Sequence, residues 1–167
     1  LRACSALTQA QFDDMTRTSF FPGIGATLNH LVTVQQFYVD ALLREQRGAP
    51  PHPDYQAFFR PEAPYAGCAD VWRAQRASDM ELVGYCAALT DDTLDRPVTI
   101  LREDRVQVET RQRLLAHLFQ HQVHHRGQVH AMLAGTTVAP PQLDEFYASG
   151  EAHLRARDFA ELGWSEE

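Results

Sequence analysis

Hydrophobic and polar positions recur at helical spacing in the first half of the chain. The segment IGATLNHLVTVQQFYVDALLREQ (residues 24–46) follows Pro22 and Gly23 and ends before the run GAPPHP (residues 48–53). Glycine and proline at these places mark the start and the end of a helix. The pattern therefore predicts a long helix over residues 24–46.

Two later segments show the same periodicity. From about residue 68 to 89, apolar side chains recur at mixed three- and four-residue spacing, as is typical of a helix. From about residue 112 to 134, apolar residues form a single stripe, and the segment stops at Gly135. The stripe consists of Leu114, Leu118, Val129 and Met132. We expect a second and a third long helix in these segments.

The segments between and after these helices have other patterns. Residues 96–110, RPVTILREDRVQVET, place β-branched side chains on both sides of a polar turn, which predicts a short β-hairpin or an extended linker before the last long helix. Beyond Gly135, the stretch up to residue 147 should be irregular, and a short amphipathic helix should follow near residues 151–162.

A short internal similarity bears on the architecture. CSALTQAQFDD (residues 4–14) aligns with CAALTDDTLDR (residues 86–96), sharing Cys, Ala, Leu, Thr and Asp. The second copy ends a long helix before a Thr-capped turn, so the first copy should do the same. Only residues 1–7 are available for that helix, which leads us to expect about 15 to 20 further residues upstream of Leu1. Chance similarity between two helix ends is the alternative.

These elements predict an all-α fold. Two helical hairpins would make an up-down four-helix bundle whose first helix is truncated in this chain. A chain of 167 residues with 44% hydrophobic content can bury a sizeable core, so we expect one domain over residues 1–167.

Composition and charge exclude several classes of partner. The net charge is −7 and the pI about 5.6, and the arginines are scattered among acids, so the sequence predicts no nucleic-acid partner. No apolar run reaches the roughly 20 residues of a membrane span, and the N-terminus lacks a signal-peptide core. Three cysteines without a Cys-x-x-Cys pair suggest reduced thiols. We expect a cytoplasmic protein with no membrane partner.

Histidines are concentrated in the third predicted helix, in HQVHHRGQ (residues 121–128) and at His117. At about 100° per residue, His121 and His125 lie roughly 40° apart, within the buried stripe. Buried imidazoles need partners for their ring nitrogens, and one divalent cation satisfies two neutral rings at once. The spacing predicts a metal site, and core histidines bonded to carbonyls and hydroxyls are the alternative.

A third ligand should come from a facing helix. His30 shares an apolar face of the first long helix with Val34 and Phe37, so it is the best candidate. His117 and His124 fall toward the edge of the stripe, and we interpret them as residues that support the ligands from outside or line the rim of the pocket. Gln128 is placed to reach a metal-bound water or ligand.

The strings LNHLV and HLFQHQVHHRGQVHAML resemble the DinB/YfiT-like family of bacterial four-helix proteins. The resemblance runs from Cys4 to about Tyr147, and PPQLDEFY (residues 140–147) is similar to the family's C-terminal segment. It implies a divalent ion, zinc or nickel, held by one histidine of the family's second helix and two of its fourth. By motif these are His30, His121 and His125. The family's usual first helix is missing here, in agreement with the expected truncation.

Three histidine ligands leave coordination positions for water or substrate, as in catalytic sites. Such an ion either lowers the pKa of bound water to about 7 or deprotonates a bound thiol. The resemblance implies the second activity, because relatives use low-molecular-weight thiols. We expect a metal-dependent thiol S-transferase acting on a low-molecular-weight thiol and a small electrophilic substrate, in a homodimer. A hydrolase using metal-bound hydroxide and a non-enzymatic stress-response metal-binding module are the alternatives. The sequence assigns no catalytic residue.

Overall fold

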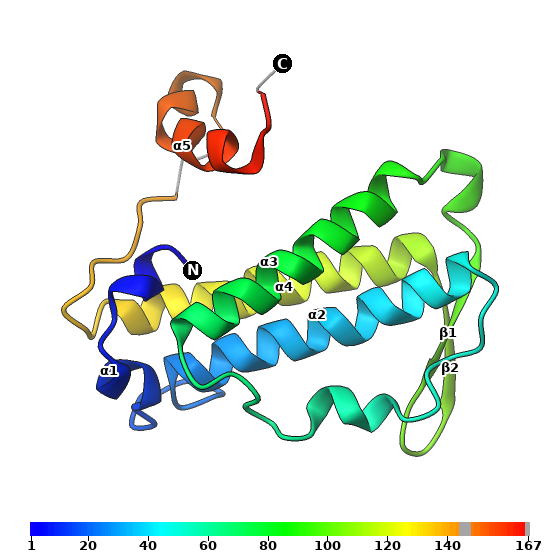
Figure 1. Cartoon of the computed structure of the whole chain (residues 1–167), viewed down its shortest axis with the longest axis horizontal. Coiled ribbons are helices and arrows are strands. Elements are labelled where there is room, and N and C mark those ends of the chain that lie inside the picture. The colour runs from blue at the N-terminus through cyan, green and yellow to red at the C-terminus, as the bar shows by residue number, and fades with distance from the viewer. Residues whose placement is uncertain (144–147, 166–167) are drawn as a thin grey trace.

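The computed structural model describes residues 1–143 and 148–165 and is mostly helical (Figure 1). Its α-helices are α1 (Gln9–Asp13), α2 (Ile24–Gln46), α3 (Cys68–Ala87), α4 (Arg111–Leu133) and α5 (Ala152–Leu162). Two strands, β1 (Pro97–Leu101) and β2 (Val106–Thr110), pair antiparallel between α3 and α4. The three long helices predicted from the sequence are confirmed within two residues at each end. No helix of the described residues is long and apolar enough to cross a membrane.

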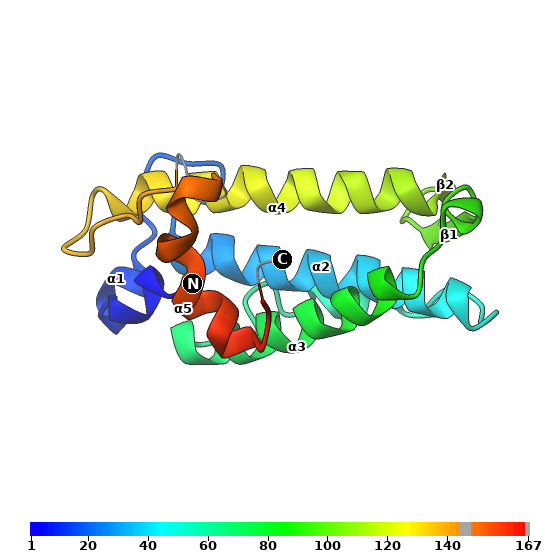
Figure 2. The ribbon, with the colours of Figure 1, turned by 90° about the horizontal axis from the view of Figure 1, so that it is seen from above.

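Helix α2 is the central element. It lies between α3 and α4 and packs against both of them, as Figure 2 shows. A helix covered on two sides buries more than one of its faces. Its buried apolar residues are Ile24, Leu28, Leu31, Val32, Val34, Phe37, Tyr38, Val39 and Leu42.

Helix α4 buries only one side. The four residues of its predicted stripe are all buried against the rest of the protein, at 0 to 6% exposure. On its other side Phe119 and Val123 are 49% and 67% exposed. Thr110 caps its first turn by accepting a hydrogen bond from the backbone N–H of Arg113 at 3.3 Å.

The predicted hairpin before α4 is confirmed, and its alternative, an extended linker, is not. Val98 and Ile100 of β1 point into the core and are 0% and 1% exposed, whereas Val106 and Val108 of β2 are 62% and 57% exposed. This is the alternation of a sheet with one buried face. The hairpin thereby closes the core at the end where α2 finishes and α4 begins.

The predicted four-helix bundle is not confirmed. The described residues contain three long helices, and Ala3–Ala6 form a 3-10 turn rather than the end of an α-helix. The residues before Thr8 span less than two helical turns, so they could form few intrahelical hydrogen bonds. The capping part of the internal similarity does hold. Thr8 forms a capping box with Gln11, and the backbone N–H of Thr90 donates to Thr93 Oγ1 at 3.2 Å.

The C-terminal region agrees with its predicted pattern where it is described. Residues 136–143 are irregular, and α5 matches the short amphipathic helix. Residues 144–147, which include part of the segment similar to the family's C-terminus, lie outside the described residues. Arg2 ties α5 to the N-terminal turn through ion pairs with Asp158 at 2.6 Å and Glu161 at 2.7 Å.

A buried ion pair connects α2 to α4 near the hairpin. Arg111, whose side chain is 5% exposed, donates from Nε and Nη2 to Glu45 Oε2 at 2.6 Å. Its guanidinium also lies 5.9 Å from the centroid of the buried Tyr85 ring of α3. Three helices therefore meet at one buried cation.

Glu45→Gln should lower the free energy of unfolding by about 3 kcal/mol, because it leaves the buried Arg111 charge without its counter-ion. Asp40→Asn is the matched control. It breaks the half-exposed Asp40–Arg44 pair on the same helix and should cost no more than about 0.5 kcal/mol. Urea denaturation of both variants measures the difference. Equal losses would show that the Arg111–Glu45 pair is no more important than an ordinary surface pair.

Candidate metal centre

Three histidines from two helices converge at the contact between α2 and α4. His30 comes from the first half of α2, whereas His121 lies near the middle of α4 and His125 one turn later. Each histidine offers one ring nitrogen, and these three nitrogens all lie within 4.8 Å of one another. The ring centroids are 5.0 Å apart for His30 and His121, 4.7 Å for His30 and His125, and 4.5 Å for His121 and His125. We refer to these three residues as the histidine cluster.

The register of α4 on α2 is set beside this cluster by Gln122. Its side chain is 8% exposed, and Nε2 donates to the backbone carbonyl of Leu31 at 3.0 Å. Because Gln122 follows His121 and Leu31 follows His30, this bond holds the two histidines opposite each other. Sequence reasoning missed Gln122, although its position about 60° from His125 placed a polar residue inside the apolar stripe.

Burial keeps the cluster neutral. The pKa of His30 is lowered from 6.5 to about 4 by desolvation and then by the nearby His125 ring. The pKa of His121 is also lowered to about 4, by desolvation and then by the neighbouring histidines. Desolvation lowers the pKa of His125 as well, against an opposing effect of its hydrogen bond with Gln128. Neutral imidazoles have lone pairs free for a metal at neutral pH.

Gln128 fixes the orientation of His125. Its Oε1 accepts a hydrogen bond from His125 Nδ1 at 2.7 Å, and its Nε2 lies 3.2 Å from His124 Nε2. Since an amide oxygen only accepts, Nδ1 of His125 carries the proton and Nε2 presents its lone pair. Gln128 thus contacts a cluster histidine directly, in the way that outer partners orient metal-binding histidines.

His117 and His124 lie at the exposed edge of the cluster. The His117 ring packs against Tyr38 at 5.4 Å and lies 6.2 Å from His121, whereas the His124 ring lies 4.9 Å from that of His125. Both side chains are exposed. The structure therefore brings both next to the cluster but does not make them part of it.

Phe21 packs against two of the cluster histidines. Its ring centroid lies 4.4 Å from that of His30 and 5.6 Å from that of His125. The loop that carries it, residues 14–23, closes so tightly that a Cβ on residue 23 would lie 2.5 Å from the Asp14 carbonyl oxygen. Only glycine fits there without a clash. No periodic pattern in the sequence singled out this loop residue.

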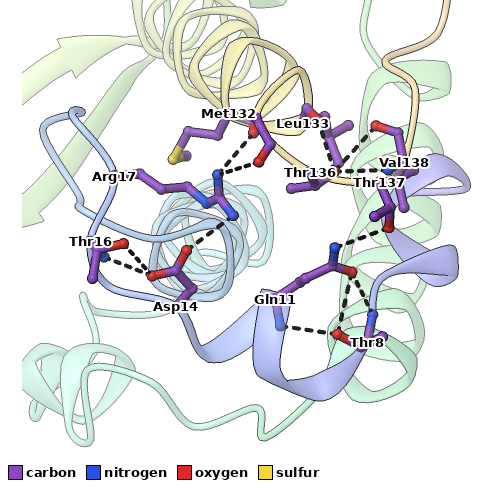
Figure 3. Close-up of polar contacts among 11 residues, drawn as sticks. Thr8, Gln11, Asp14, Thr16, Arg17, Met132, Leu133, Thr136, Thr137 and Val138 are labelled. Carbon is purple, nitrogen blue, oxygen red and sulfur yellow. Dashed lines mark hydrogen bonds and ion pairs between the residues drawn. The ribbon is translucent and has the colours of Figure 1, made fainter.

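Arg17 anchors the same loop to the end of α4 (Figure 3). Its Nη1 donates to the carbonyls of Met132 and Gly135, each at 3.4 Å, and its Nη2 pairs with Asp14 at 3.0 Å. A cation at a helix C-terminus satisfies carbonyls that have no partner within the helix. The position of Phe21 is therefore tied to the helix that supplies His121 and His125.

The donor set fits a divalent metal ion. His30 Nε2 and His121 Nε2 are only 3.0 Å apart, close to the roughly 3.3 Å between two nitrogens that share a tetrahedral zinc ion. A cation between these two nitrogens would take both lone pairs, whereas a direct hydrogen bond between them uses only one. Because the three nitrogens are neutral and converge, they could hold one ion.

Comparison with known proteins agrees with this geometry. The sequence model of the DinB family matches residues 1–155. The chain belongs to the DinB family. No curated protein and no solved structure matches the chain significantly. The family match covers α2, α4 and all three cluster histidines, and the role of those histidines as metal ligands stays a prediction.

The stability of the metal-free protein should fall as the pH drops from about 6.5 toward 4. In this pH window His30 and His121 are protonated in the unfolded chain but stay neutral in the folded protein, where both have a pKa of about 4. The stability is complete above the unfolded pKa and decreases as the pH falls below it. Urea denaturation in the presence of a chelator, at about pH 7, 6 and 5, measures the slope.

The matched variants of this experiment are His121→Gln and His153→Gln. The first removes one partly buried titrating group and should flatten the decline, whereas the second removes an exposed histidine of α5 and should leave it unchanged. A decline of the same size in both variants would contradict the assignment of the pH dependence to the cluster.

Proposed function

We propose that the chain binds one divalent ion, zinc or nickel, through His30, His121 and His125. The observation that carries this proposal is the convergence of their ring nitrogens within 4.8 Å. Three imidazoles without a carboxylate suit borderline transition metals rather than magnesium or calcium, which prefer oxygen ligands. We also propose that residues 1–167 form one domain that acts in the cytoplasm as a homodimer, for which the exposed Phe119 and Val123 offer apolar surface.

We further propose that the site activates a low-molecular-weight thiol for transfer to a small electrophile. When bound, the ion would stabilise the thiolate form of that thiol. Phe21 packs against His30 and His125, while the exposed side chains of His117 and His124 leave their side of the cluster open to a substrate. His124 Nε2 faces the Gln128 amide, so the exposed His117 is the better acceptor for the proton that the thiol loses.

The arrangement favours thiol activation over hydrolysis. A hydrolase that uses metal-bound hydroxide commonly adds a carboxylate that orients the attacking oxygen and transfers protons during attack. Among the described residues, no carboxylate forms a hydrogen bond or ion pair with the histidine cluster. A thiol needs less help, because its lower pKa lets metal coordination alone deprotonate it.

Metal content tests the first part of the proposal. Protein purified without a histidine tag and refolded with zinc or nickel should retain about one ion per chain. His121→Ala should abolish this retention, whereas His153→Ala, on α5, should not affect it. Elemental analysis after gel filtration measures both. Retention far below one ion in the unmodified chain would refute the metal site.

Activity assays test the second part. The metal-loaded protein should consume thiol and electrophile together when it is assayed against a panel of both. His121→Ala should remove this turnover while circular dichroism shows an intact fold. If no pair turns over and chelation unfolds the protein, the ion has a structural role, as in a non-enzymatic metal-binding module.

Gln128→Leu should weaken zinc binding by about 10- to 100-fold, because His125 loses the acceptor that fixes its ring orientation. Gln120→Leu is the matched control, since Gln120 lies on the exposed side of the same helix two turns earlier. Competition with a chromophoric zinc chelator gives both affinities. An unchanged affinity in Gln128→Leu would mean that the metal holds the His125 ring without help.

A further inference from the structure

A second polar group lies along the same seam between α2 and α4, at the end near the hairpin. Arg102, in the turn of the β-hairpin, is half-buried, and its Nη2 donates to Tyr38 Oη at 2.8 Å. Its Nε donates to Gln107 Oε1 at 3.3 Å. The guanidinium carbon lies 5.2 Å from the centroid of the Phe37 ring and 5.6 Å from that of Tyr38. Arg102 is therefore held in one orientation by two hydrogen bonds and two aromatic rings.

This cation has only neutral partners. Within the part of the chain that the structure describes, no carboxylate forms an ion pair with Arg102, whereas its neighbour Arg105 pairs with Asp104 at 3.0 Å. Its two hydrogen bonds use two of the five N–H donors of a guanidinium, so three donors remain. The Tyr38 hydroxyl accepts from Arg102 and keeps its own hydrogen available to donate. A fixed guanidinium beside a free hydroxyl donor is suited to a carboxylate, which accepts two parallel hydrogen bonds.

A continuous row of side chains joins this group to the histidine cluster. The Tyr38 ring packs against His117, and His117 packs toward His121, with centroid distances of 5.4 Å and 6.2 Å. His117 is exposed, so a bound molecule can reach along this row from solvent. The row spans on the order of 10 Å, about two helical turns.

We propose that Arg102 and Tyr38 bind a carboxylate at the far end of the thiol whose sulfur is activated at the histidine cluster. This inference rests on the proposed metal-dependent function and specifies its substrate class as an elongated, carboxylate-bearing thiol. Arg102 supplies the charged hydrogen bonds and Tyr38 the neutral one, while the exposed His117 ring lines the path between the two ends. Binding at two separated points orients the sulfur relative to the electrophile.

The test uses cobalt(II)-substituted protein, whose visible bands report metal binding and whose near-ultraviolet thiolate band reports thiol binding. The probes are ω-mercaptoalkanoates of propionate to undecanoate length, each compared with the ω-mercaptoalcohol of the same length. The alkanoates should bind about tenfold more tightly than the alcohols once the chain spans the row, and no more tightly when it is shorter. Binding without this length-dependent advantage would overturn the carboxylate subsite alone.

Arg102→Gln should remove the advantage of the long alkanoates and leave the affinity of the alcohols unchanged. Arg105→Gln, in the same hairpin turn, is the matched control and should keep the advantage. Arg102→Lys retains the charge without the paired donors of a guanidinium, so it should keep part of the advantage. This variant provides the test if Arg102→Gln does not fold. Survival of the full advantage in both Arg102 variants would also refute the subsite. Absence of the visible cobalt bands would instead overturn the proposed metal site, and this inference with it.

Discussion

The contact between α2 and α4 is the constraint on which the site depends. Two helices supply the histidine cluster, so a shift of one residue in their register would rotate His121 away from His30 by about 100°. Gln122 fixes this register beside the cluster, and the Arg111–Glu45 pair fixes it again near the hairpin. Both contacts are polar groups buried among apolar side chains, where an unsatisfied partner is costly. A displaced register would separate these partners and leave buried polar groups unsatisfied, so it is unfavourable.

Much of this arrangement could be predicted from the sequence because it depends on helical periodicity. The ends of α2 follow from Gly23 and the Gly/Pro run after residue 47, and the buried stripe of α4 follows from its spacing of leucine, valine and methionine. Helical phase alone also brought His121 and His125 to the side of α4 that faces α2. The choice of His30 required only that its own face be apolar. These inferences hold because they concern residues within a single regular element.

The remaining features depend on contacts between elements that no periodic pattern encodes. Phe21 and Arg102 lie in loops, and their positions follow from tertiary contacts with α4 and α2. The four-helix architecture was inferred from an internal similarity whose capping residues do form equivalent turns. Those turns specify only local backbone geometry, and three long helices satisfy them as well as four. Local capping signals therefore predict where helices end but not how many long helices pack together.

The histidine cluster also explains why this part of the core tolerates polar residues. In the metal-free state, three imidazoles share few hydrogen-bond partners, and His121 Nδ1 has none among the described residues. A core selected only for stability would replace them by leucine or phenylalanine, which fill the same space without unsatisfied nitrogens. A cation bound to the lone pairs that burial keeps unprotonated would offset this cost. Ion binding and fold stability are then linked, because the ion binds the folded arrangement and not the unfolded chain. The burial of three imidazoles at the contact between α2 and α4 is thus itself an argument for a ligand.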